Sequence, residues 1–291
     1  MLKRLFIIFL YCCYGLVLVG VLLFFFFPRD RFLIWVAERV EQKLPGFECR
    51  IEQIRYVHPF KLGLYQIFLD NPAERISIPI DTLLASFEMK WPVEEFQVSA
   101  VLYGGAVESV VTVNGKANRF ELTNLSVTSV QLQGIDFVQK RLDRQIRGTY
   151  SMSGDLKIDG SNQPEVVFDG IIEIDQFFTK LRRPVLGFSE IDFTNITADV
   201  HLDRNTFDIS AGRYKGELIS GEFSGVIMLQ NPWQQSTLDM KGGVIPEARL
   251  LESDPQLTEA IARLYREYRQ EAIPCRIEGT VQEPEFRFGS K

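Results

Sequence analysis

The chain has 291 residues, 46% of them hydrophobic, and carries 32 basic against 38 acidic residues, a net charge of −6. This length suits one large domain or two small ones. The acidic balance and the absence of a long basic patch argue against a nucleic-acid partner.

The first feature along the chain is an apolar segment from Leu5 to Phe27 that contains no charged residue. At about 1.5 Å per residue, a helix of this length reaches roughly 34 Å, enough to cross a hydrocarbon core of about 30 Å. A cleaved signal peptide is the alternative, but its apolar core is typically about 7–15 residues long, and no small-x-small cleavage site follows here. We therefore expect residues 1–28 to be a single transmembrane anchor, with the N-terminus inside and the rest of the chain outside.

Residues 29–45 have the spacing of an amphipathic helix. Leu33, Ile34, Ala37, Val40 and Leu44 recur every three or four residues, and Pro45-Gly46 ends the pattern. Such a helix beside a membrane can lie on the bilayer surface or cover a sheet, and we favour the second interpretation.

From residue 46 onward the hydrophobic period changes to two, which is typical of strands with one dry and one wet face. Tight-turn sequences punctuate these strands at short intervals, so we expect a mainly antiparallel meander. Two helices interrupt it, over residues 135–146 and 253–272. We therefore predict a mainly β protein in which residues 46–291 form one elongated, curved sheet, shaped as a groove or a partly closed barrel, with a few short capping helices.

The stretch from Ile209 to Leu229 is rich in glycine and contains no obvious catalytic residue. Glycine at such positions permits a bulge or bend where a sheet curls. We expect Gly212, Gly216 and Gly221 to allow bending, and Tyr214 to fill the space that the glycines leave. We expect the segment from Val226 to Leu229 to line a dry interior.

The apolar strand faces need a cover, and the expected helices are few. The sequence leaves two possibilities open: a closed core filled by protein, or an open groove that holds acyl chains. The residues that we expect to line this interior are Tyr103, Ile172, Ile174, Tyr214, Val226 and Met228.

Two of the four cysteines, Cys49 and Cys275, lie outside the expected anchor and would face an oxidising compartment. A disulfide between them would tie the first strand to the last; two free thiols are the alternative, and the sequence does not decide.

No arrangement typical of catalysis occurs. The two histidines, His58 and His201, belong to no cluster with metal-ligand spacing, and no nucleophile elbow, phosphate-binding loop or dinucleotide fingerprint is present. We expect a protein that is not an enzyme, with no catalytic, metal or cofactor site.

Four motifs occur in order along the chain: "LYGGAVESVV", "VQLQGIDFVQKRLDRQIRGTYSMSGDLKIDG", "FSGVIMLQNPWQQSTLDMKGGVIP" and "IEGTVQEPEFRF". Together with the single anchor, this order resembles the type II secretion system protein N family and the broader AsmA-like group.

The resemblance implies an inner-membrane protein with a periplasmic β domain. It implies a non-enzymatic component or assembly factor of type II secretion, with other secretion components as partners. The alternative that it offers is an AsmA-like protein that binds or transfers phospholipid along an apolar β groove. The chain is short for a conduit that would bridge the periplasm alone.

Overall fold

A computed structural model describes residues 14–15, 18, 29–57, 61–90, 93–114, 119–159, 165–185, 188–253, 255–268 and 272–289. The anchor expected at residues 1–28 lies outside these residues, apart from Tyr14, Gly15 and Leu18. Among the described residues, no helix has both the length and the apolar character that crossing a membrane requires.

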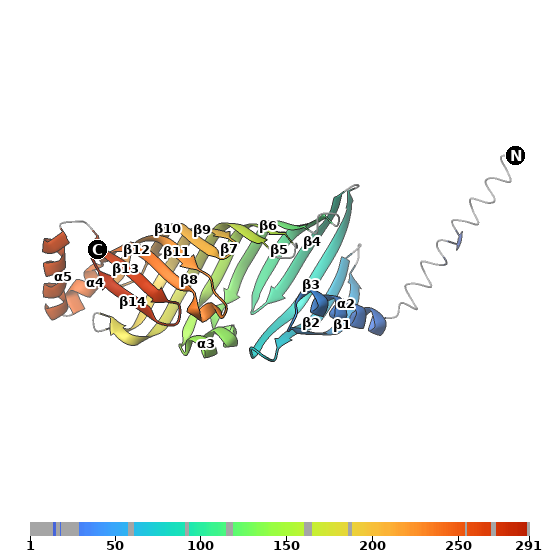
Figure 1. Ribbon diagram of the computed structural model, residues 1–291, viewed down its shortest axis with the longest axis horizontal. Coiled ribbons are helices and arrows are strands. Elements are labelled where there is room, and N and C mark those ends of the chain that lie inside the picture. The colour runs from blue at the N-terminus through green and yellow to red at the C-terminus, as the bar shows by residue number, and fades with distance from the viewer. Residues whose placement is uncertain are drawn as a thin grey trace.

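The described chain forms one 14-stranded sheet in which each strand pairs, antiparallel, with the next strand in sequence. β1 and β14 form its two edges, so the sheet is not closed (Figure 1). The predicted antiparallel meander is confirmed. The strands are β1 (Glu48–Val57), β2 (Lys61–Asn71), β3 (Ile76–Lys90), β4 (Val93–Leu102), β5 (Gly105–Asn114), β6 (Arg119–Gln131), β7 (Ile146–Asp159), β8 (Glu165–Val185), β9 (Phe188–Asp203), β10 (Thr206–Lys215), β11 (Ile219–Met228), β12 (Thr237–Pro246), β13 (Ile273–Thr280) and β14 (Pro284–Phe288).

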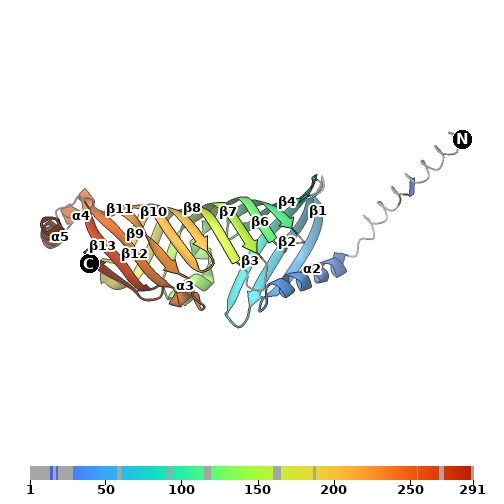
Figure 2. The ribbon, with the colours of Figure 1, turned by 45° about the horizontal axis from the view of Figure 1, so that its top comes forward.

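Figures 1 and 2 show the sheet as a long, twisted and curved ribbon whose strands follow one another from β1 at one end to the last strands at the other. Thirteen steps between the 14 strands, at about 4.8 Å each, give a path of about 62 Å across the strands. The prediction of an elongated, curved sheet is therefore confirmed.

Helices lie at both ends of the sheet and beside its middle. They are α2 (Arg29–Lys43), α3 (Asp136–Leu142), α4 (Ala248–Ser253) and α5 (Pro255–Tyr268), with short 3-10 turns at Leu132–Gly134 (η1) and Trp233–Gln235 (η2). Both helical segments expected inside the β domain are present, near the predicted places. Pro255 occupies the first helical position of α5, where its missing N–H leaves no hydrogen bond unmade.

The face of the sheet against which α2 packs is called the inner face below. Phe32, Leu33, Val36, Ala37 and Val40 of α2 pack against a buried cluster formed by Cys49, Ile54, Leu64 and Ile67 of β1 and β2. The prediction that this helix covers the sheet is confirmed for Leu33, Ala37 and Val40. It is wrong for Ile34 and Leu44, which are exposed.

The possible disulfide between Cys49 and Cys275 is not formed: both thiols are free. Cys49 lies on β1 and Cys275 on β13, near opposite ends of the sheet (Figure 1). A disulfide requires Cα atoms about 4.4–6.8 Å apart. Because the sheet does not close, its first and last strands do not meet. Burial raises the pKa of both thiols, and the charge of Glu41 adds to the effect at Cys49.

Candidate functional site

A continuous apolar row runs across the inner face of all 14 strands. The strand register places each of its members directly opposite the next, and none is charged or polar. From β1 to β14 the row is Ile54, Leu64, Leu83, Ala100, Val107, Val127, Met152, Ile172, Ala198, Gly212, Phe223, Gly242, Cys275 and Phe288.

Aromatic rings and glycines interlock along this row. A Cβ atom added to Gly212 would lie 2.5 Å from the ring of Phe223, its partner on β11. The side chain of Tyr214 covers Gly221 in the same way, and its hydroxyl donates a hydrogen bond to the Gly243 carbonyl oxygen at 3.0 Å. Burial raises the pKa of Tyr214 far above its usual value. The expected partnership of Tyr214 with glycine is therefore present.

The opposite, outer face of β10–β13 carries ion pairs. Arg213 pairs with Glu222 at 3.7 Å, and Arg276 pairs with Asp239 at 2.9 Å and Glu278 at 3.0 Å. These pairs are exposed, so each adds little to stability. Their consequence is a face that water wets, which leaves the inner face as the apolar surface that needs a cover.

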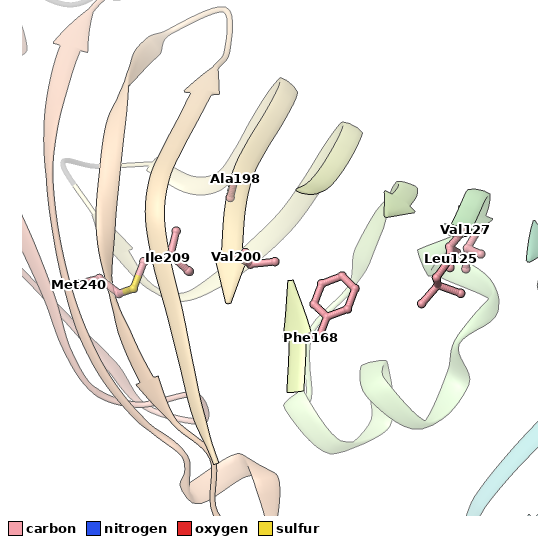
Figure 3. Close-up of a cluster of buried hydrophobic side chains, with 8 residues drawn as sticks. Leu125, Val127, Phe168, Ala198, Val200, Ile209 and Met240 are labelled. Atoms are coloured by element: carbon pink, nitrogen blue, oxygen red, sulfur yellow. The ribbon is translucent and has the colours of Figure 1, made fainter. Parts of the chain in front are cut away.

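The apolar side chains of the inner face are buried to different extents along the sheet. One buried cluster joins β6, β8, β9, β10 and β12 (Figure 3); its members are Leu125, Val127, Val130, Phe168, Ala198, Val200, Ile209 and Met240. A second lies under α2. The third joins Leu250 of α4 and Ile261 of α5 to Ile273 of β13, and all three side chains are at most 2% exposed.

Between these clusters lies a stretch that we call the window, formed by Leu83 and Ala85 of β3, Val98 and Ala100 of β4, and Val107 of β5. All five side chains are partly exposed. Between Ile67 and Leu125, no hydrophobic side chain is buried among the residues whose burial the structure describes. The side chains of the window are mostly small, so they cannot fill the space above their own strands. Leu83 packs against the cluster under α2 and Val107 packs against the large cluster, whereas Ala85, Val98 and Ala100 belong to neither cluster.

Three of the six residues expected to line the interior are strand residues on the inner face: Ile172, Ile174 and Tyr214. A fourth, Tyr103, lies in the turn between β4 and β5 and packs against the large cluster. Its hydroxyl donates a hydrogen bond to the backbone oxygen of Ser77 at 3.2 Å.

The placement expected for Val226 and Met228 is wrong. Both lie on the outer face of β11, where Val226 is paired with Asp208 and Asp239, and Met228 is 41% exposed. Ile227 takes the inner position instead. Gly221 lies on the inner face opposite Tyr214, so every second residue after Gly221 in β11 lies on that face too. This alternation places Ile227, and not Val226 or Met228, on the inner face.

The window itself was missed because sequence periodicity does not show which apolar positions neighbouring elements cover. Val98 and Ala100 alternate with polar or exposed neighbours just as covered strand residues do, and Ala85 lies between Leu84 and Ser86. Their small size was the one available signal.

Among the described residues, no group of three or more His, Cys, Asp or Glu side chains could hold a metal ion. His201 lies on the outer face, with its Nδ1 2.5 Å from a carboxylate oxygen of Asp169, and that hydrogen bond raises the pKa of His201. His58 lies outside the described residues. No protein family, curated protein or solved structure matches the chain.

Proposed function

We propose that this protein binds lipid acyl chains along the inner face of its sheet, without catalysing a reaction, as a lipid-binding or phospholipid-transfer protein of the cell envelope. In this proposal residues 1–28 anchor the chain in the inner membrane, and the sheet stands in the periplasm. The observation that carries the proposal is the apolar row that crosses all 14 strands and is left partly exposed at the window.

Leaving this row in contact with water costs free energy. Each square ångström of apolar surface removed from water contributes about 25 cal/mol, and contiguous apolar patches beyond a few hundred Å² mark binding sites. An acyl chain suits this row because it is apolar along its whole length and requires no hydrogen bonds from the sheet.

The length of the row fits such an occupant. The hydrocarbon core of a bilayer is about 30 Å thick, so one leaflet contributes about 15 Å. A path of about 62 Å across the strands is therefore about four leaflets long. The row is therefore long enough to hold an extended acyl chain, and the window is the part of it proposed to take that chain.

The test compares two aspartate variants on one strand of the full-length protein. Val98 is on the inner face in the window, whereas Val101 is on the outer face and 40% exposed. Val98→Asp should lower the phospholipid that co-purifies with the chain, measured by mass spectrometry after detergent exchange, because a carboxylate in the row repels acyl chains. Val101→Asp should leave it unchanged. Since both variants keep the same anchor, lipid around the anchor is equal in both, and equal lipid contents would refute the proposal.

A second candidate is a non-enzymatic component or assembly factor of type II secretion. What favours it is the element order from β6 through η1 and α3 to β7, which matches the strand, short helix and strand that the resemblance implies. Affinity purification from membranes should then recover other secretion components. Unchanged protein secretion in a deletion strain would exclude this role.

A further inference from the structure

Two large hydrophobic side chains of helix α2 lie on the side that does not touch the sheet, among the exposed polar side chains of Arg31, Glu38 and Gln42. Ile34 is 58% exposed and Trp35 is 51% exposed, on the side of the helix opposite Leu33, Val36 and Val40. The indole of Trp35 is held in place: its centroid lies 5.7 Å from that of Phe32 and 5.7 Å from the guanidinium carbon of Arg39. The Trp35 side chain therefore keeps about half of its surface exposed while its ring contacts Phe32 and Arg39.

Exposed large hydrophobic side chains gather at this end of the molecule. Among the described residues after the expected anchor they include Ile34, Trp35, Leu44 and Tyr56. Those elsewhere are Val101, Ile171 and Ile245 on separate strands, and Met228 and Leu229 at the end of β11. Scattered exposed residues need no explanation, but an aromatic and an aliphatic side chain adjacent on one helix face indicate a surface that is covered in use.

The position of α2 directly after the expected anchor indicates which surface lies against Ile34 and Trp35. The helix begins at Arg29, two residues after the uncharged segment that ends at Phe27. Trp35 is eight residues beyond Phe27, about 12 Å along a helix, whereas a headgroup layer is only about 5–8 Å thick. A helix leaving along the membrane normal would carry Trp35 into water. A helix lying in the interface plane places Ile34 and Trp35 among headgroups and upper acyl carbons, where tryptophan is enriched.

We propose that the Ile34–Trp35 side of α2 docks on the surface of the phospholipid bilayer in which the chain is anchored. Arg31, Glu38 and Gln42, which are exposed on the same side, would face the headgroups. Since the other side of α2 packs on β1 and β2, docking would bring this end of the inner face to the membrane (Figure 2). The inference rests on the proposed anchor, but it does not depend on lipid in the window.

The experiment uses the full-length chain in phosphatidylcholine vesicles and reads the emission of single tryptophans. The chain has three tryptophans, Trp35, Trp91 and Trp233. The variant Trp91→Phe/Trp233→Phe reports on Trp35 alone. The matched control, Trp35→Phe/Trp91→Phe, reports on Trp233 in η2, between β11 and β12. Vesicles made with lipids brominated near the headgroup end of the acyl chain quench only an indole that enters the bilayer.

We expect Trp35 to lose most of its emission in brominated vesicles and to be protected from aqueous iodide, while Trp233 is indifferent to bromine. Emission from Trp35 that iodide quenches and bromine does not would overturn the proposal, because the side chain would then be in water. Protection from both quenchers would also overturn it, since another protein surface or a second copy would then cover the helix. Neither readout depends on whether the window holds lipid, so the two proposals can fail separately.

Discussion

Strands β3–β5 and strands β6–β12 have the same alternation of apolar and polar residues, but their inner faces are covered differently. In β6–β12, the Phe168 ring lies across Gly154 and Gly170 and belongs to the buried cluster of Figure 3. Phe223, which lies across Gly212, packs against that cluster. In β3–β5, Ala85, Val98 and Ala100 offer little volume, and no described hydrophobic side chain there is buried. Side-chain volume therefore distinguishes the buried cluster of β6–β12 from the partly exposed inner face of β3–β5.

The largest difference in unfolding free energy should come from a valine-to-aspartate substitution made once in each region. Val200 is 4% exposed in the large cluster, so Val200→Asp buries an unpaired carboxylate and should cost about 4 kcal/mol of unfolding free energy. Val98→Asp in the window should cost less than about 1 kcal/mol, because the carboxylate stays in contact with water. Denaturant unfolding of the two variants without added lipid measures both values. Equal losses would mean that the window is as tightly covered as the cluster.

A smaller effect should appear at alkaline pH. Tyr150 packs against the large cluster from β7, and burial raises its pKa to about 12. Because this pKa is above the ordinary value of about 10, the stability that it contributes is complete below pH 10 and is lost as pH rises through about 12, up to about 2–3 kcal/mol. Denaturant unfolding at several pH values should show this loss of stability. In Tyr150→Phe, which has no hydroxyl to titrate, this part of the alkaline loss should be absent. An unaltered alkaline profile in Tyr150→Phe would show that Tyr150 is not sealed from water.

The smallest effect concerns the contact between Gly212 and Phe223. Gly212→Ala should cost about 2 kcal/mol, since its Cβ would overlap the Phe223 ring. In a Phe223→Ala background the same change should cost about 1 kcal/mol less, because the ring is gone. As a control, Ala100→Val in the window should change stability by less than about 0.5 kcal/mol. A strictly additive double-mutant cycle would contradict the interlocking of rings and glycines.

Much of the fold could be predicted because local patterns determine it. Alternation and turn sequences gave the antiparallel meander, and Pro255 marked the start of α5. It was harder to predict on which face of the sheet each strand residue lies. In β10 the register shifts between Ile209 and Gly212, so Ile209 and Gly212 share the inner face although they are three residues apart. A simple period of two cannot cross such a bulge.

Long-range relations could not be predicted. The pairing of Cys49 with Cys275 was considered because both lie outside the expected anchor, yet strand order separates them. Which apolar face is covered depends on where α2, α4 and α5 pack, and those contacts are tertiary. For the same reason the window has no sequence pattern beyond the small size of its side chains.

The central claim is that the window holds lipid, and a photocrosslinking residue tests it most directly. Ala100 and Val101 are adjacent on β4 but lie on opposite faces, Ala100 in the apolar row and Val101 outside it. A benzophenone amino acid at position 100, irradiated in native membranes, should give a protein–phospholipid adduct in the intact mass spectrum, and the same group at position 101 should give none. Absence of the adduct at position 100, or equal adducts at both positions, would contradict the account.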